Sequence, residues 1–194
     1  MNLPNKLTTI RMILIPVFTL LLALNWPAGS VTLLGTKIAL SWLIAVIIFI
    51  CASLTDLADG KIARHNHLVT NYGKFADPLA DKLLVMTAFI FLAARGTIPA
   101  WGVAIILWRE LAVTGLRLLL ANGGEVLAAA WPGKIKTATQ MFAIIFLMLN
   151  NLGFAAIHVP FGQILFYLAV FFTLYSGIEY FYKNRGVFAD SFGK

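Results

Sequence analysis

Charged residues are scarce in this sequence, and acidic residues are the scarcest of them. Only 12% of the 194 residues are charged and only 8 are Asp or Glu, whereas 60% are hydrophobic. A soluble domain of this length needs more polar surface than these residues supply. The composition therefore excludes an ordinary soluble enzyme and predicts a single integral membrane domain over residues 1–194.

Cysteine is nearly absent as well. The single cysteine, Cys51, lies within an apolar run, which excludes an intramolecular disulfide and argues against redox chemistry. The N-terminal region also lacks the basic stretch, short apolar run and small-residue cleavage site of a signal peptide. We therefore expect the first apolar run to be retained as a membrane span.

Long apolar runs dominate what is present. Six of them are long enough to cross a bilayer as helices, at about residues 9–25, 37–63, 73–95, 100–121, 133–152 and 161–182. Pro16 is expected to kink the first. The predicted fold class is all-α, a polytopic integral membrane protein with six transmembrane helices.

Basic residues give the chain a net charge of +7. They are spread between apolar runs rather than clustered, which favours anionic lipids and phosphorylated substrates over nucleic acid as partners. Most lie at the N-terminus, in the connections after the second and fourth runs, or in the tail, whereas Lys37 and Arg95 lie on the other side. The positive-inside rule then predicts that both termini face the cytoplasm.

Four of the eight acidic residues lie within one short stretch. Asp56 and Asp59 are three residues apart near the end of the second run, and Asp77 and Asp81 are four apart near the start of the third. On helices each pair shares a face, so a hairpin would gather four carboxylates. Such charges repel unless a cation separates them, and hard divalent cations prefer oxygen ligands. We predict a metal site here, because capping or solvated side chains would not explain four acids on matching faces.

The same stretch has the pattern D-x2-D-G-x2-A-R-x8-G-x3-D-x3-D, which resembles at every fixed position the signature of the CDP-alcohol phosphotransferase family. The resemblance implies a membrane enzyme that transfers the phosphoalcohol part of a CDP-linked substrate to a second alcohol and releases CMP. It also implies a homodimer and a centre of two ions, Mg²⁺ or Mn²⁺. Asp56, Asp59, Asp77 and Asp81 would hold these ions, and Asp81 would also be the general base.

Other segments resemble the bacterial family members that make phosphatidylglycerophosphate. These segments are residues 2–16, the residues around Arg109-Glu110 and Arg117, and residues 133–140. This resemblance implies CDP-diacylglycerol as donor and glycerol 3-phosphate as acceptor, for phospholipid biosynthesis at the cytoplasmic face of a bacterial inner membrane. The residues implied to bind CDP-diacylglycerol are Asn5, Thr8, Asp59, Gly60, Ala63, Arg64, Thr70 and Gly73.

Two arginines of the fourth run share one helical stripe. Arg109 and Arg117 are eight residues apart, and guanidinium groups within a membrane helix need anionic partners. Glu110 is a candidate partner for one, and an acceptor phosphate for the other. With Lys134 and Lys136, they form the predicted site for glycerol 3-phosphate. The alternative is a structural Arg–Glu pair with lysines at the membrane boundary.

Rival functions remain open at this point. A family member with another acceptor, such as a cardiolipin synthase using phosphatidylglycerol or an enzyme using inositol phosphate, would carry the same signature. A cation transporter is the alternative from another class, because carboxylates within membranes mark ion pathways. Metal flux without CMP release would identify the transporter.

Overall fold

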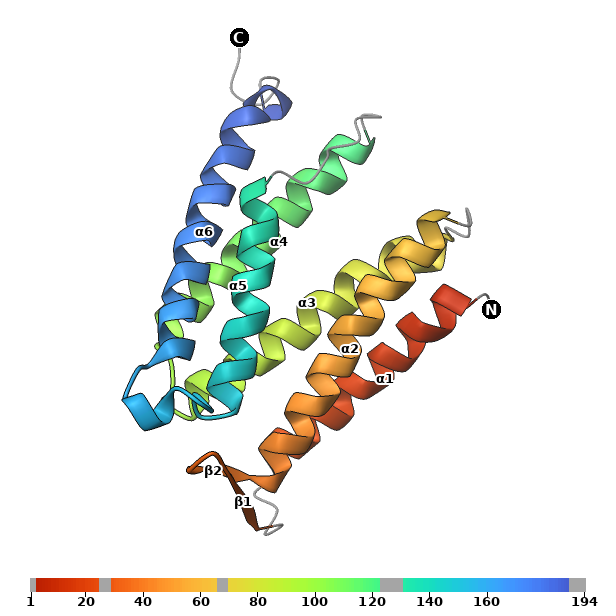
Figure 1. Ribbon diagram of the computed structural model, residues 1–194. Helices are drawn as coiled ribbons and strands as arrows, with labels where there is room; N and C mark the ends of the chain where they lie inside the picture. The colour runs from red at the N-terminus through yellow and green to blue at the C-terminus, as the bar shows by residue number, and fades with distance from the viewer. Residues whose placement is uncertain (1–2, 25–28, 66–69, 123–130, 189–194) are drawn as a thin grey trace.

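The computed structural model describes residues 3–24, 29–65, 70–122 and 131–188 of the chain (Figure 1). The described part is mostly helical, as predicted. Its long helices are α1 (Leu3–Ala23), α2 (Leu40–His65), α3 (Asn71–Ala94), α4 (Ala100–Asn122), α5 (Trp131–Met148) and α6 (Phe161–Lys183). Two short 3₁₀ helices, η1 (Ala155–Ile157) and η2 (Arg185–Phe188), flank α6.

A β-hairpin between α1 and α2 departs from the predicted all-α fold. Strand β1 (Ser30–Leu33) pairs antiparallel with β2 (Thr36–Ala39), so the helix predicted to begin at residue 37 begins at Leu40 instead. The two turn residues, Leu34 and Gly35, both have positive φ, at 46° and 76°. This is the backbone that a tight two-residue hairpin needs.

Two other predicted boundaries were wrong. The first helix begins at Leu3 rather than near residue 9, so the polar N-terminal segment is helical, and Pro16 lies inside α1. Helix α5 ends at Met148 rather than near 152, because Asn150 and Asn151 have left-handed backbones with φ of 52° and 57°.

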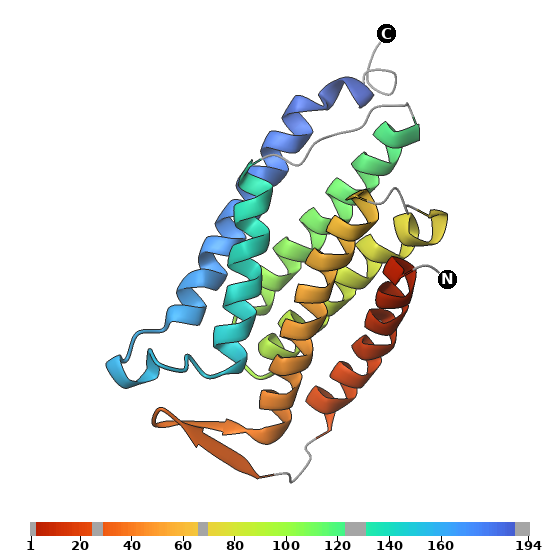
Figure 2. The ribbon, with the colours of Figure 1, turned by 45° about the vertical axis from the view of Figure 1, so that its right-hand side comes forward.

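The helices form two groups that meet along α3. Helix α1 packs against α2 and α3, α6 packs against α4 and α5, and α3 also contacts α4 and α5. The shared core contains fully buried aromatic side chains from α2, α3 and α6, namely Phe49, Phe89 and Phe166. In both ribbon views, the start of α1, the end of α2 and the start of α3 lie toward one end of the molecule, and the hairpin lies at the other (Figures 1 and 2).

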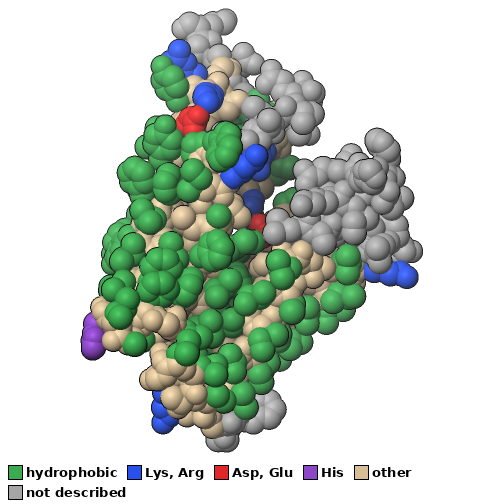
Figure 3. Space-filling view, in the orientation of Figure 1, with side chains coloured by type: hydrophobic (Ala, Val, Ile, Leu, Met, Phe, Trp, Pro, Cys, Tyr) green, Lys and Arg blue, Asp and Glu red, His purple; other side chains and the backbone are tan. Residues whose placement is uncertain are grey.

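Helices α1 and α6 are long and apolar enough to cross a membrane, over Asn5–Ala23 and Phe161–Lys183. The Leu40–Asp56 part of α2 is a shorter apolar segment. Large apolar side chains, such as Ile13 and Ile178, are exposed on the outer surfaces of these helices. Hydrophobic side chains cover much of the face in Figure 3. Such a surface suits contact with lipid.

Candidate active site

The N-terminal half of α1 carries polar side chains on its inner face. Arg11 Nη1 donates a hydrogen bond to Asp56 Oδ1 of α2 at 2.6 Å, which also makes an ion pair. Thr8, one turn earlier, donates a hydrogen bond to Asp77 of α3. Both Arg11 and Thr8 are 1% exposed. One face of α1 therefore holds a carboxylate from each acidic pair.

The start of α3 belongs to the same polar cluster. Thr70 is the N-cap residue, and its hydroxyl oxygen accepts a hydrogen bond from the Gly73 amide at 3.0 Å. The same hydroxyl donates to Asn5 Oδ1 at 2.8 Å. A Cβ at Gly73 would lie 3.4 to 3.5 Å from Thr70, Asn5 and Asp77, so the absence of a side chain there keeps a small space open. Three residues of the predicted donor pocket thus meet beside Asp77.

Three of the four predicted metal ligands lie on facing helices. The carboxylates of Asp77 and Asp81 both act electrostatically on Asp56. Asp59 follows Asp56 on α2, but its side chain lies outside the described part of the structure. The same holds for the side chains of Ala63 and Arg64 and for the surroundings of Gly60. The predicted roles of these four residues therefore stay predictions.

The donor chemistry of these carboxylates suits Mg²⁺ or Mn²⁺, because both ions prefer oxygen ligands. Among the side chains that the structure describes, no three His, Cys, Asp or Glu gather closely enough to hold a metal ion. Asp56 is also engaged by Arg11 on one oxygen. The described carboxylates therefore offer the oxygen ligands that a hard cation prefers, and they lie on facing helices. A complete metal centre would need further ligands.

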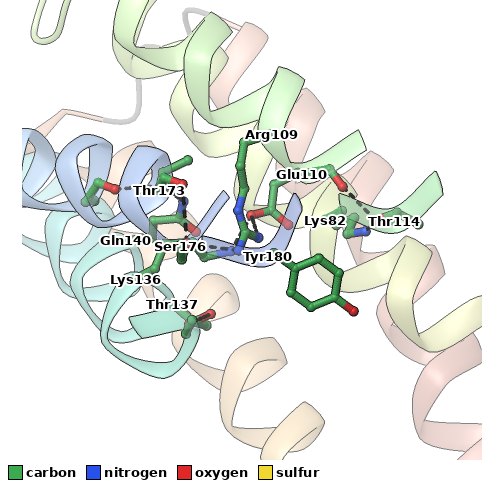
Figure 4. Close-up of polar contacts among 12 residues, drawn as sticks. Lys82, Arg109, Glu110, Thr114, Lys136, Thr137, Gln140, Thr173, Ser176 and Tyr180 are labelled. Atoms are coloured by element: carbon green, nitrogen blue, oxygen red, sulfur yellow. Dashed lines mark hydrogen bonds and ion pairs between the residues drawn. The ribbon is translucent and has the colours of Figure 1, made fainter. Parts of the chain in front are cut away.

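A second polar cluster lies where α3, α4 and α5 meet (Figure 4). The small pocket there is lined by Asp81, Lys82, Val85, Met86, Glu110, Lys136, Thr137 and Gln140. Buried Glu110 accepts hydrogen bonds from Lys136 and, at 3.3 Å, from Arg109 Nη1. Lys82 donates to Thr114 of α4. Asp81, the predicted general base, thus lies beside a strongly basic group of side chains.

The four residues predicted to bind the acceptor occupy different places. Lys136 is buried and lines the pocket, and Arg109 is bonded to the pocket residue Glu110. Arg117 lies against Tyr180 of α6 and acts electrostatically on Lys82. Lys134 is exposed and lies over the Trp131 ring, 5.5 Å from its centroid, apart from the pocket-lining residues.

Sequence reasoning missed several residues of these clusters. The pattern of basic residues marks Arg11 only as one of those near the N-terminus, although its spacing of three from Thr8 places both on one face of a helix. Lys82 follows Asp81 directly, and no sequence pattern singles it out. Ser176 and Tyr180 of α6 contact the two arginines. They carry no sequence signal of their own, because each is a single polar residue in an apolar run.

The chain belongs to the CDP-alcohol phosphatidyltransferase family, whose sequence pattern matches residues 1–175. It is 50% identical over 183 residues to the CDP-diacylglycerol–glycerol-3-phosphate 3-phosphatidyltransferase of Bacillus subtilis, covering 94% of this chain and 95% of that protein. The protein of the same name from Haemophilus influenzae is 35% identical, covering 98% and 97%. A probable phosphatidylglycerophosphate synthase of Mycobacterium tuberculosis is 38% identical, covering 92% and 79%.

Proposed function

We propose that this protein transfers the phosphatidyl group of CDP-diacylglycerol to glycerol 3-phosphate, giving phosphatidylglycerophosphate and CMP in phospholipid biosynthesis. The observation that carries the proposal is the 50% identity, over 94% of the chain, to a relative named for this reaction. The two polar clusters support it, because the reaction needs one site for a diphosphate and another for a phosphorylated alcohol.

The donor site is proposed at the cluster between α1, α2 and α3. Its residues would be Asn5, Thr8, Asp59, Gly60, Ala63, Arg64, Thr70 and Gly73. The missing side chain at Gly73 and the hydroxyl of Thr70 support close approach of a diphosphate to the backbone. Divalent ions held by Asp56, Asp59, Asp77 and Asp81 would neutralise the diphosphate and the phosphate that leaves.

The acceptor site is proposed at the cluster between α3, α4 and α5, on the basis of its charge. Its interacting charged residues are Asp81, Lys82, Arg109, Glu110, Arg117 and Lys136. Four cations and two anions leave a formal charge of +2. A phosphate monoester carries about −1.5 to −2 at neutral pH, so glycerol 3-phosphate would balance it. An acceptor without a free phosphate would leave this excess uncompensated.

The proposed chemistry centres on Asp81, which lines the acceptor pocket and also acts on Asp56. Its carboxylate takes the proton from the sn-1 hydroxyl of glycerol 3-phosphate. The oxygen then attacks the phosphorus that carries diacylglycerol. The bond from this phosphorus to the bridging oxygen breaks, and CMP leaves with the electron pair.

The membrane arrangement is part of the same proposal. The length of the six long helices, 18 to 26 residues each, supports six membrane spans. The excess of Lys and Arg supports an orientation with both termini and the two sites toward the cytoplasm of a bacterial inner membrane. There, the acyl chains of the donor remain in lipid. A homodimer is expected from the family resemblance.

Measurement of CMP release tests the function. The full-length protein in mixed micelles is given CDP-diacylglycerol and, in turn, glycerol 3-phosphate, glycerol, phosphatidylglycerol or inositol phosphate, each with and without Mg²⁺ or Mn²⁺. We expect CMP release only with glycerol 3-phosphate and a metal ion. Preference for phosphatidylglycerol would identify a cardiolipin synthase, and metal flux through vesicles without CMP release would identify a transporter.

A further inference from the structure

Helix α6 carries a buried polar stripe on one side. Thr173, Ser176 and Tyr180 are 0%, 4% and 8% exposed, and Gly177 is buried between them. Their spacing of three and four residues places them on one face of the helix. That face packs against α4 and α5, and Thr173 accepts a hydrogen bond from Gln140 Nε2 of α5 at 3.4 Å. These polar residues face other helices rather than lipid, so contact with the membrane does not explain them.

Tyr180 contacts Arg117 in two ways. Arg117 Nε donates a hydrogen bond to the Tyr180 hydroxyl at 3.3 Å, and the guanidinium carbon lies 5.4 Å from the centroid of the ring. In the described part of the chain, the two terminal nitrogens of Arg117 have no hydrogen-bond partner. Tyr180 therefore limits the directions open to the arginine side chain and leaves its two Nη groups for an anion.

Ser176 and Gly177 contact Arg109 in a complementary way (Figure 4 labels Ser176 and Arg109). Arg109 Nη2 donates a hydrogen bond to Ser176 Oγ at 2.9 Å. A Cβ at Gly177 would lie 3.0 Å from Arg109 Cγ, so the aliphatic part of the arginine crosses α6 where a side chain is missing. The guanidinium group stays beside Glu110, at 3.3 Å.

We infer that α6 positions the acceptor site: Tyr180 holds the guanidinium group of Arg117, and Ser176 that of Arg109, beside the cluster proposed to bind the acceptor phosphate. Gly177 supplies the space that Arg109 needs. The inference rests on the proposed function and adds Ser176, Gly177 and Tyr180 to it as positioning residues, which act through the two arginines. A rotationally free arginine loses side-chain entropy when it is fixed. Fixing it before the substrate arrives lowers that cost of binding.

Removal of the Tyr180 hydroxyl tests the inference. Tyr180→Phe keeps the ring and loses one hydrogen bond, so we expect the KM for glycerol 3-phosphate to rise about 2- to 12-fold, the range for one hydrogen bond. The KM for CDP-diacylglycerol and kcat should change less than about twofold, on the same reasoning. Tyr175→Phe is the matched control, because Tyr175 lies on the same helix and is 53% exposed.

Gly177→Ala provides the second variant. The added methyl group displaces Arg109, and the KM for glycerol 3-phosphate should rise while the KM for CDP-diacylglycerol stays constant. A merely structural role would lower the amount of active enzyme and hence kcat, without separating the two KM values. The split between substrates is therefore the diagnostic readout.

Two results would overturn the inference while leaving the proposed function intact. One is a Tyr180→Phe enzyme whose KM values match those of Tyr175→Phe, with Gly177→Ala equally unaffected. The other is an equal rise of both KM values, which indicates general distortion of the bundle. CMP release by the unmodified protein that does not depend on glycerol 3-phosphate would overturn the proposed function, and the inference with it.

Discussion

The clearest test of the polar cluster between α3, α4 and α5 is removal of its buried anion, Glu110. This carboxylate accepts from both Lys136 and Arg109, and its side chain is only 11% exposed. Glu110→Gln keeps the shape of the side chain but leaves two cations without their shared partner. Lys136→Met, in contrast, leaves Glu110 paired with Arg109. The structure therefore predicts that Glu110→Gln is the more damaging of the two.

The magnitude follows from the burial of the pair. Removing one member of a buried ion pair costs about 3–5 kcal/mol, because the remaining charge is left uncompensated. We assign about 5 kcal/mol to Glu110→Gln and about 3 kcal/mol to Lys136→Met within that range. For a chain of this size, 1 kcal/mol lowers Tm by about 2–4 °C. The expected falls in Tm are about 10–20 °C and about 6–12 °C.

The assay is apparent thermal unfolding in detergent micelles, with and without glycerol 3-phosphate. The phosphate should replace the missing carboxylate, so the ligand should raise the Tm of Glu110→Gln more than that of the unmodified protein. Lys183→Met is the matched control: it also removes a lysine paired with a glutamate, here Glu179 at 2.5 Å, but Lys183 is 64% exposed. An exposed pair contributes at most about 1 kcal/mol.

Two outcomes would refute this reasoning. The charge argument fails if Lys136→Met lowers Tm as much as Glu110→Gln does. The phosphate argument fails if glycerol, which carries no phosphate, protects Glu110→Gln as well as glycerol 3-phosphate does.

Three further substitutions test the general base and the donor site. Asp81→Asn should abolish CMP release while CDP-diacylglycerol still binds to the protein in micelles; substantial turnover would remove Asp81 from the role of general base. Asp56→Asn should lose activity together with the stabilisation by Mg²⁺ or Mn²⁺ in thermal unfolding, and a retained metal effect on Tm would contradict its role as a ligand. Thr8→Val should lower kcat/KM about 10-fold or more, because Asp77 loses a charge-assisted hydrogen bond worth about 1.5–3 kcal/mol; an unchanged metal requirement and rate would show that this bond is dispensable.

The helical fold was predictable because apolar run length alone determines where a chain can cross a bilayer. The hairpin at Ser30–Ala39 was not, because two strands of four residues give too little periodicity to detect. Its turn also uses a leucine, Leu34, at positive φ, which is unusual for that residue. The polar start of α1 was missed for a related reason: four polar residues in seven indicate a loop when no apolar face is visible.

Periodicity predicted that Asp56, Asp77 and Asp81 lie on matching helix faces, and Asp77 and Asp81 do act electrostatically on Asp56; the metal site itself stays a prediction. The α6 contacts were not predictable. Tyr180 and Arg117 are 63 residues apart, and their pairing depends on α6 packing beside α4, which no local pattern encodes. Single polar residues in an apolar helix become informative only when the neighbouring helix is known.

Helix α3 gives the proposed reaction its geometry. Gly73 and Asp77 face α1 and the donor cluster, whereas Asp81 and Lys82 line the acceptor pocket. Asp77 and Asp81 are one turn apart, which is about 6 Å along the helix axis. An in-line transfer needs the attacking hydroxyl, the phosphorus and the leaving oxygen to lie within about that length. A base at the boundary between the two sites can therefore reach the attacking hydroxyl without a movement of α3. Asp81 is the described carboxylate that lines the acceptor pocket and also acts on the donor cluster.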